Sequence, residues 1–297
     1  MKVLVVGLGR MGGGIAKRLK SNGVQVFGYA RHSRIEDIPR LKDLSEVESL
    51  LSEEDLIWLM VPHEAVDEVL DHLMPYLKAG QIVVDGGNSF YRDSQRRYHK
   101  LKERGVYFLD VGVSGGVYGE EKGYCLMIGG DEEAFNRARD VFRVLSYGGV
   151  GYAYLGPSGA GHFAKMVHNG IEYAMMQAIG EGFELLKESE FNYDLEKVAW
   201  IYNQGSVIRS WLMELTQKVF EDFGNLENVK AYVEDTGEGR WTVLEAIRLS
   251  VPVPTIADAL FMRFRSRQEN SFRDRLLAAL RYEFGRHEVK KSGDEGT

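Results

Sequence analysis

The chain has 297 residues, of which 44% are hydrophobic and 27% are charged, the composition of an ordinary folded globular protein. Its 37 Lys and Arg residues against 44 Asp and Glu residues give a net charge of −7, which argues against general binding to nucleic acids or membrane surfaces. The sequence contains no run of about 18 uncharged apolar residues, so no membrane span is expected. Cys125 is the only cysteine, which excludes an intrachain disulfide and a cysteine-based zinc site and favours a reducing cytoplasm.

Residues 1–156 alternate short β-rich runs with amphipathic segments. This alternation predicts βαβ units, hence an α/β domain with a mainly parallel sheet and helices on both faces. The expected strands are Val3–Val6, Gln25–Tyr29, Leu56–Val61, Ile82–Asp85, Tyr107–Val111 and Tyr124–Ile128. The expected helices between them include Gly13–Asn22, Ala65–Leu77 and Ser94–Arg104.

Residues 157–297 have a helical period instead, which predicts an all-α second domain. The expected helices are Ala160–Ser189, Leu195–Tyr202, Ser210–Glu221, Trp241–Leu249, Ile256–Ser266 and Ser271–Tyr282. Val251-Pro-Val-Pro254 separates two of them, because proline lacks an N–H donor and restricts the residue before it.

A glycine pattern, Gly7-Leu-Gly9-Arg-Met-Gly12, stands where the first expected strand turns into a helix. The first glycine allows a tight turn, the second lets the backbone approach a diphosphate, and the third lets helix pack on strand. The helix N-terminus then offers N–H groups and the positive end of its dipole to the phosphates. This context favours a Rossmann-type dinucleotide site over a glycine-rich turn of an unrelated α/β fold. The predicted cofactor-binding residues are Gly7, Leu8, Gly9, Arg10, Met11, Gly12, Arg31, Val61 and Asn88.

The end of the second strand predicts which dinucleotide binds. An acid there binds the free ribose hydroxyls of NAD, whereas an arginine accommodates the 2′-phosphate of NADP. Ala30 stands at that position, followed by Arg31, His32 and Arg34, with no acid before Glu36. We therefore expect NADP to be preferred over NAD. The alternative is that Arg31 and Arg34 are solvated surface charges.

The long helix expected after residue 160 carries a polar stripe. Lys165, His168, Asn169 and Glu172 stand at i, i+3, i+4 and i+7, within roughly 100° of arc. A second polar set, between residues 177 and 188, points roughly 130° away from the first. A straight helix does not need two solvent faces, so the first stripe is interpreted as a site and not as a solvated face.

The side chains of the stripe suggest acid–base chemistry. A lysine partly desolvated in a cleft can act as a base, and a glutamate one or two turns along can act as an acid. His168 and Asn169 can orient substrate hydroxyls or serve only as structural hydrogen-bonding groups. Phe183 continues the line of the stripe, which indicates that this side of the helix is interior.

Two further loops are expected to meet this helix. Asp85-Gly-Gly-Asn-Ser89 and Val113-Ser-Gly-Gly116 follow expected strands, and open α/β sheets bind ligands beyond the carboxyl ends of their strands. Paired glycines permit close backbone approach, although either loop alone could be a plain turn.

Taken together, these motifs resemble those of the 6-phosphogluconate dehydrogenase family, decarboxylating enzymes of the β-hydroxyacid dehydrogenase superfamily, in their short bacterial form. The resemblance covers essentially the whole chain, and the run Lys165-Met-Val-His-Asn-Gly-Ile-Glu-Tyr173 is its most specific part. Further motifs agree with it: Asp85–Ser89, Gly112–Gly116, Glu120–Gly130 and Arg281–His287.

The resemblance implies oxidation of 6-phospho-D-gluconate at C3 with hydride passing to a nicotinamide, then loss of CO2 to give ribulose 5-phosphate. It makes Lys165 the base for the C3 hydroxyl and Glu172 the acid that protonates C1 of the enediol. It implies substrate contacts from Asn88, Ser114, Gly115, Gly116, His168, Asn169 and Tyr173. It makes Arg281 and His287 a pair that reaches the sugar phosphate of a neighbouring subunit, so a homodimer or homotetramer is expected.

One departure concerns the phosphate. A lysine that the long form carries before its tryptophan has no counterpart before Trp241, and Arg267 is a candidate to supply the charge instead. Neither a metal nor a nucleic acid nor a membrane is expected as a partner. Two other readings remain, a dehydrogenase of small hydroxy acids that does not decarboxylate and a dinucleotide-binding sensor without activity.

Overall fold

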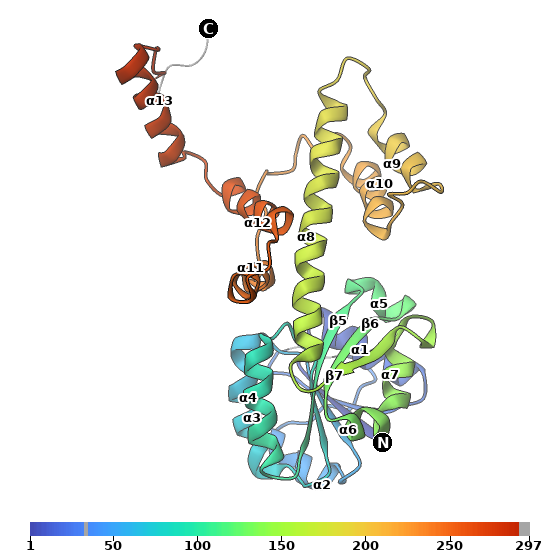
Figure 1. Ribbon diagram of the computed structural model, residues 1–297. Coiled ribbons are helices and arrows are strands. Elements are labelled where there is room, and N and C mark those ends of the chain that lie inside the picture. The colour runs from blue at the N-terminus through green and yellow to red at the C-terminus, as the bar shows by residue number, and fades with distance from the viewer. Residues whose placement is uncertain (33–34, 291–297) are drawn as a thin grey trace. The chain divides into compact units, whose positions relative to one another are not determined.

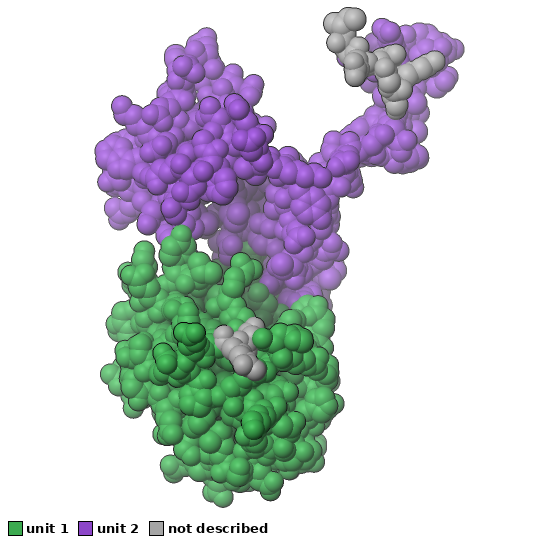
Figure 2. Space-filling model, turned by 180° about the vertical axis from the view of Figure 1, so that it is seen from behind, with its two compact units in different colours: residues 1–170 green, residues 171–297 purple. Residues whose placement is uncertain are grey.

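The computed structural model describes residues 1–32 and 35–290. The chain divides into two compact units, residues 1–170 and residues 171–297, which Figure 2 colours separately. Each unit is described by itself. The boundary expected at residues 156–157 from sequence texture remains a prediction. The first compact unit runs on to Gly170, because the start of the long helix packs on the sheet.

The first unit is built on one seven-stranded sheet with the order β2-β1-β3-β4-β5-β6-β7 (Figure 1). Neighbouring strands are parallel except for β5 and β6, as expected for a mainly parallel sheet. The strand order reverses between β1 and β3, and ligands of open α/β sheets bind at such a switch point. The strands are β1 (Lys2–Val6), β2 (Gln25–Tyr29), β3 (Leu56–Leu59), β4 (Ile82–Asp85), β5 (Tyr107–Ser114), β6 (Cys125–Gly130) and β7 (Tyr152–Gly156).

Two hydrophobic cores cover the two faces of this sheet. Alternate residues of a strand point to opposite faces, so Val3 and Val5 join one core while Leu4 and Val6 join the other. Helices α1 and α7 close the first core, and helices α3 and α4 close the second. The α-helices of this unit are α1 (Arg10–Ser21), α2 (Val47–Leu50), α3 (Val66–Leu73), α4 (Tyr91–Lys102), α5 (Gly119–Lys122), α6 (Glu132–Arg137) and α7 (Arg139–Leu145). Short 3-10 turns are η1 (Leu44–Glu46), η2 (His63–Ala65), η3 (Met74–Tyr76), η4 (Gly116–Tyr118) and η5 (Tyr147–Gly149).

The long helix α8 (Ala160–Lys187) begins in the first unit and continues into the second, where the remaining elements are all helical. Within the second unit Phe183 is buried with Leu195, Ala199 and Met213, so the interior side predicted for this helix is confirmed. The other helices are α9 (Leu195–Asn203), α10 (Trp211–Phe223), α11 (Glu238–Leu249), α12 (Pro254–Ser266) and α13 (Phe272–Gly285).

The structure differs from the sequence prediction in several places. Strand β3 ends two residues before the expected Val61, and helices α6 and α7 were not predicted. The helix expected at Ala65–Leu77 ends as α3 at Leu73 and continues as a 3-10 turn, because Pro75 cannot donate a backbone hydrogen bond. Strand β5 continues three residues past Val111, so Ser114 lies at the end of a strand and not in a loop. Strand β7 was not predicted, since its five residues alternate between half-buried and exposed and form an edge of the sheet.

Candidate active site

The glycine loop lies between β1 and α1, as predicted. Gly7 has a φ of +96°, which suits glycine, and its N–H donates to the carbonyl oxygen of Tyr29 at 2.8 Å. A Cβ placed on Gly12 would lie 1.9 Å from the carbonyl oxygen of Gly7, so the strand and the helix can meet only if this residue has no side chain. A Cβ on Gly9 would meet no atom of the described residues within 4 Å. The backbone therefore leaves room for a ligand at Gly9, whereas at Gly7 and Gly12 it packs against neighbouring backbone.

The first turn of α1 suits an anion. Gly9 is the N-cap residue, no side chain caps the helix, and the first turn holds no acid. The N–H groups at the start of a helix carry partial positive charge, which favours a phosphate. Val61 lies at the neighbouring strand end, where its Cγ1 atom would be 3.0 Å from a Cβ on Gly7. The residues present fit the diphosphate of a dinucleotide.

Arg31 lies just past β2, with 68% of its side chain exposed. Its guanidinium forms an ion pair with Glu68 of α3, a partner the sequence did not reveal. Arg40 donates to the carbonyl oxygens of Ala30 and Arg31 and so holds the backbone of this turn. Arg34, which we also considered as a surface charge, lies outside the described residues.

The loop after β4 presents Asn88 to solvent between two buried neighbours, Gly87 and Ser89. The fully buried carboxylate of Asp85 fixes this loop: Oδ1 accepts from the N–H of Gly87 at 3.2 Å, and Oδ2 accepts from the Ser89 hydroxyl at 2.7 Å. Arg97 of α4 binds the same carboxylate at 3.0 Å.

A buried aspartate also fixes the start of α8. Asp110, fully buried in β5, accepts from the N–H of Gly159 at 2.7 Å and from the N–H of His162 at 2.9 Å. A carboxylate at a helix N-terminus satisfies N–H groups that have no partner within the helix. The imidazole Nδ1 atom of His162 lies 2.7 Å from the Ser94 hydroxyl, which links α8 to α4.

Helix α8 touches the sheet along a seam of glycines. A Cβ on Gly112 would lie 2.4 Å from the Cβ of Lys165. A Cβ on Gly161 would lie 2.3 Å from the carbonyl oxygen of Asp110, and one on Gly129 would lie 2.6 Å from the nitrogen of Gly161. The absence of these side chains lets the helix lie directly on β5 and β6.

Lys165, Asn169, His168 and Ser114 form one hydrogen-bonded cluster at the end of β5. The buried terminal nitrogen of Lys165 donates to Asn169 Oδ1 at 2.7 Å. The same oxygen lies 3.0 Å from His168 Nδ1, which must carry the hydrogen because an amide oxygen only accepts. The Nε2 atom of His168 lies 3.3 Å from the Ser114 hydroxyl. Three residues of the stripe that the spacing predicted thus lie in one cluster with Ser114, which was expected to contact substrate. Gly115, with a φ of +128°, and Gly116 follow directly.

Helix α8 continues into the second unit, where Glu172 is half-buried and Tyr173 is buried. The guanidinium of Arg263 lies 3.5 Å above the centroid of the Tyr173 ring and donates to the carbonyl oxygen of Glu234 at 2.7 Å. Sequence reasoning missed Arg263, because no spacing rule connects residue 263 to residue 173. The close packing of Gly239 on the Tyr173 ring belongs to the same cluster.

The other basic residues expected at the phosphate have different surroundings. Arg267 donates to Asp235 at 2.9 Å, and Arg240 binds the same carboxylate, whose pKa both guanidiniums lower from its usual value. Arg281 lies exposed on α13, and His287 follows the end of that helix. The structure therefore gives Arg267 a partner within its own unit, and the phosphate role of all three remains a prediction.

Over residues 1–32 and 35–290, no group of three or more His, Cys, Asp or Glu side chains is placed to hold a metal ion. No helix in the same part of the chain is long and apolar enough to cross a membrane.

Comparison with known proteins supplies the family. Residues 2–156 match the model described as the NAD binding domain of 6-phosphogluconate dehydrogenase, and residues 161–294 match that of the C-terminal domain of 6-phosphogluconate dehydrogenase. Both halves of the chain thus match in the order that the family has.

Individual proteins agree with these matches. YqeC of Bacillus subtilis, provisionally named a 6-phosphogluconate dehydrogenase, is 44% identical over 98% of this chain and 100% of its own length. A Haloferax volcanii protein named NAD(+)-dependent, decarboxylating 6-phosphogluconate dehydrogenase is 43% identical over 99% of this chain and 100% of its own length. The solved 6-phosphogluconate dehydrogenase of Plasmodium falciparum, studied with NADP+ and with 6-phosphogluconate, superimposes with a TM-score of 0.81 at 27% identity, covering 100% of this chain and 67% of that one. The chain belongs to the 6-phosphogluconate dehydrogenase family.

Proposed function

We propose that the protein oxidises and decarboxylates 6-phospho-D-gluconate to ribulose 5-phosphate and CO2, using a nicotinamide dinucleotide. The observation that carries the proposal is the cluster of Lys165, Asn169, His168 and Ser114, which gathers a buried amine and three hydrogen-bonding side chains at the end of β5. A sensor that only binds a dinucleotide has no use for a buried lysine held in this way, since burying an ionisable side chain costs free energy.

Lys165 is assigned the role of base. It takes the proton of the C3 hydroxyl while the C3 hydrogen leaves as hydride, so C3 is oxidised to a ketone. Asn169 holds the lysine side chain at its terminal nitrogen, and His168 holds the Asn169 oxygen that accepts from it. Both side chains are assigned to orient the substrate hydroxyls, because each offers hydrogen-bonding groups in this cluster. The dinucleotide, when bound, supplies the hydride acceptor.

Glu172 is assigned the role of acid. The 3-keto acid loses its carboxyl group as CO2, and the electron pair of the broken C–C bond forms a C=C bond while the C3 carbonyl oxygen takes a proton back from Lys165, which gives an enediol. Glu172 then donates a proton to C1 of the enediol while Lys165 takes the hydroxyl proton again, which gives the ketone ribulose 5-phosphate. Lys165 and Glu172 lie seven residues apart on one unbroken helix, a spacing that returns to the same helix face. This spacing supports separate roles at neighbouring carbon atoms.

The loop from Gly7 to Gly12 is proposed to hold the diphosphate of the dinucleotide, with Leu8, Arg10 and Met11 completing its backbone. We assign NADP as the preferred cofactor, because Ala30 offers no carboxylate to ribose hydroxyls and Arg31 can bind a 2′-phosphate. The names of relatives include both cofactors. The pairing of Arg31 with Glu68 means that a 2′-phosphate has to compete with this carboxylate.

The sugar phosphate is proposed to bind Arg281 and His287, contributed by a second copy of the chain, together with Arg267 or Arg263. Planar guanidiniums bind phosphate oxygens bidentately. A homodimer or homotetramer is supported by the apolar side chains that α13 leaves exposed, among them Phe272, Leu277 and Phe284. The exposed thiol of Cys125 supports a reducing compartment such as the cytoplasm.

One assay tests the proposal. The purified protein is given 6-phosphogluconate with NADP or NAD, and reduced cofactor and CO2 are followed together. Equal amounts of both products are expected. Reduced cofactor without CO2 would identify a dehydrogenase that does not decarboxylate, and neither product would support the sensor. In the same assay Glu172→Gln should slow the release of ribulose 5-phosphate, whereas full production would make Glu172 a structural residue.

A further inference from the structure

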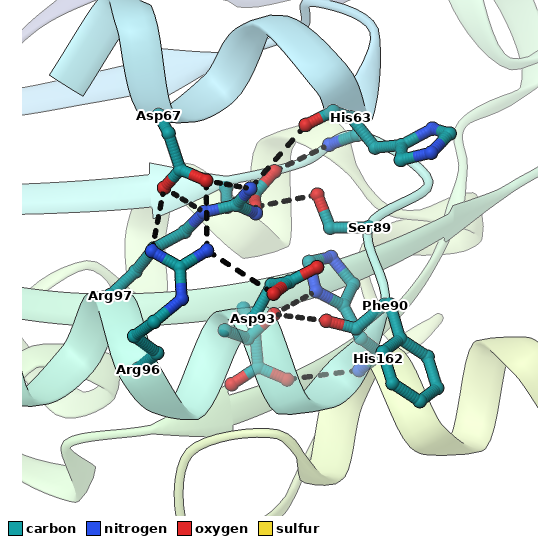
Figure 3. Close-up of polar contacts among 12 residues, drawn as sticks. His63, Asp67, Ser89, Phe90, Asp93, Arg96, Arg97 and His162 are labelled. Carbon is teal, nitrogen blue, oxygen red and sulfur yellow. Dashed lines mark hydrogen bonds and ion pairs between the residues drawn. The ribbon is translucent and has the colours of Figure 1, made fainter.

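Arg97 is a charged side chain buried at a place where sequence analysis assigned no function. Only 2% of it is exposed, and it lies on α4 beneath the loop that follows β4 (Figure 3). A buried guanidinium is tolerated only if its donors are satisfied, because moving a charge out of water is costly. Its partners therefore show what the fold uses it for.

The first partner of Arg97 is Asp85, at 3.0 Å, and neither side chain is more than 2% exposed. The Asp85 carboxylate also binds Gly87 and Ser89, the residues on either side of Asn88. The loop is thus fixed on both sides of Asn88, the exposed residue proposed to contact substrate and dinucleotide. Arg97 sets the orientation of the carboxylate that fixes it.

The other partners of Arg97 lie after the neighbouring strand. Its Nε and Nη2 atoms donate to the carboxylate of Asp67 at 2.9 and 3.2 Å, and Nη2 lies 3.4 Å from the carbonyl oxygen of His63. His63 comes two residues after Val61, which packs beside Gly7 of the phosphate loop. A single guanidinium therefore connects the loop after β3 to the loop after β4.

The preceding residue, Arg96, provides a natural comparison. It binds the same Asp67 carboxylate, at 2.8 Å, but 55% of its side chain is exposed and its second carboxylate partner is Asp93 of its own helix. Arg96 thus shares the charge and one partner of Arg97 without a contact to Asp85 among the interactions described. If variants of Arg97 and Arg96 differ in activity, the difference therefore measures the effect of the contact between Arg97 and Asp85, which fixes the Asn88 loop.

We propose that Arg97 is a positioning residue for hydride transfer: it holds the Asn88 loop and the segment after Val61 in one fixed relation without touching substrate or dinucleotide. This inference rests on the proposed function, in which Asn88 contacts the reactants. Misplacing a reacting group by about 1 Å can cost roughly 100-fold in rate, so a loosened loop should affect the chemical step more than binding.

The test compares Arg97→Lys with Arg96→Lys. Lysine keeps the positive charge, but all its donors sit on one nitrogen, whereas Arg97 reaches Asp85, Asp67 and the His63 carbonyl from three separate nitrogens. For Arg97→Lys we expect kcat to fall about 10- to 100-fold, with KM for 6-phosphogluconate changed less than threefold. Deuterium at C3 of the substrate should then slow turnover more than in the wild type. Arg96→Lys should retain kcat within twofold.

Ser89→Ala keeps the test decisive if Arg97→Lys folds poorly. It leaves the buried ion pair in place and removes only the hydrogen bond between Asp85 and Ser89. We expect a kcat lower by about threefold to tenfold, together with the same increase in the isotope effect. Unchanged kcat and isotope effect in both Arg97→Lys and Ser89→Ala would overturn the proposal.

A second measurement separates this inference from the proposed function. Amide hydrogen exchange over residues 86–90 should be at least tenfold faster in Arg97→Lys than in the wild type, and unchanged in Arg96→Lys. If the wild type is inactive with 6-phosphogluconate, the proposed function fails and the role of Arg97 in hydride transfer fails with it, even if exchange rises. If the wild type is active and both exchange and kcat stay unchanged in Arg97→Lys, only the positioning role fails.

Discussion

Two regions at the carboxyl edge of the sheet are built in opposite ways. The glycine loop at residues 7–12 owes its shape to missing side chains, and its binding groups are backbone N–H groups. The other region, here called the polar edge, consists of four buried charged residues: Asp85 at the end of β4, Asp110 within β5, Arg97 on α4 and Lys165 on α8. Substitutions that add side-chain atoms should impair the glycine loop, whereas substitutions that remove side-chain atoms should impair the polar edge. The four predictions below test this difference.

The largest effect is expected at the polar edge. Lys165→Met removes the terminal nitrogen while keeping most of the side-chain volume, so hydride transfer should fall about 10²- to 10⁴-fold with cofactor binding unchanged. Single-turnover reduction of the nicotinamide measures the first quantity, and cofactor titration measures the second. A loss of activity below about threefold would refute the assignment of Lys165 as the base.

In the glycine loop, two alanine substitutions should differ. Gly12→Ala places a methyl group 1.9 Å from the carbonyl oxygen of Gly7, so the loop has to move and the melting temperature should fall. The methyl group of Gly9→Ala meets no atom within 4 Å in the part of the chain that the structure describes, so stability should be kept. Both should raise the Kd for the dinucleotide at least about tenfold, because the second glycine lets the backbone approach the diphosphate. Equal melting temperatures for the two variants would contradict the steric argument.

The third prediction concerns Arg31, whose side-chain charge is proposed to add to the binding of the dinucleotide by the backbone of the glycine loop. The ratio of kcat/KM for NADP over NAD is expected to be at least about ten in the wild type and to fall about tenfold in Arg31→Ala, because a charged hydrogen bond to the 2′-phosphate is lost. Glu68→Gln should raise the ratio about two- to threefold, since it frees Arg31 from its ion pair. A wild-type preference for NAD, or an unchanged ratio in Arg31→Ala, would overturn the interpretation of this turn.

The smallest effect concerns pH. Hydrogen bonds from Arg97, and then from Arg96, hold the pKa of the Asp67 carboxyl well below its usual value of 3.8. A folded-state pKa that is lowered contributes stability above the unfolded pKa, and this contribution disappears as the pH falls through the folded value. Asp67→Asn should therefore melt at a lower temperature than the wild type at pH 7, and the difference should narrow below about pH 4.

The size of this difference is limited by solvent. The Asp67 side chain is 44% exposed, so screening reduces its effect to about 1 kcal/mol, or about 2–4 °C in melting temperature. Asp140→Asn is the matched control, because Asp140 pairs with Arg143 at a surface where its side chain is 87% exposed. A difference that stays constant from pH 7 to pH 3 would contradict the link to the Asp67 carboxyl.

The two regions also differ in how well the sequence predicts them. The glycine loop, the parallel sheet and the stripe from Lys165 to Glu172 are local patterns, because each depends on residues within a few turns of one another. The ion pair between Arg97 and Asp85 joins residues 12 apart, and the contact between Arg97 and Asp67 joins residues 30 apart. No periodicity connects such residues, so their pairing appears only in three dimensions.

Smaller departures have similar causes. Arg31 and Arg267 remain predicted phosphate ligands, and their pairing with Glu68 and Asp235 was not predicted because those carboxylates lie 37 and 32 residues away. Strand β5 passes Val111 because Gly112 fits beneath Lys165, whereas in the sequence a glycine suggests the end of a strand. Sequence alone thus located the candidate residues, while the structure supplied the partners that orient them.

The glycine seam between α8 and the sheet limits how such an enzyme could be redesigned. At Gly112, Gly129 and Gly161 even one methyl group would overlap the facing strand or helix. Libraries that seek acceptance of other sugar acids should therefore leave these three codons fixed. They should instead vary an exposed position such as Asn88. The distance between base and sheet would then stay constant while the shape of the accepted molecule changes.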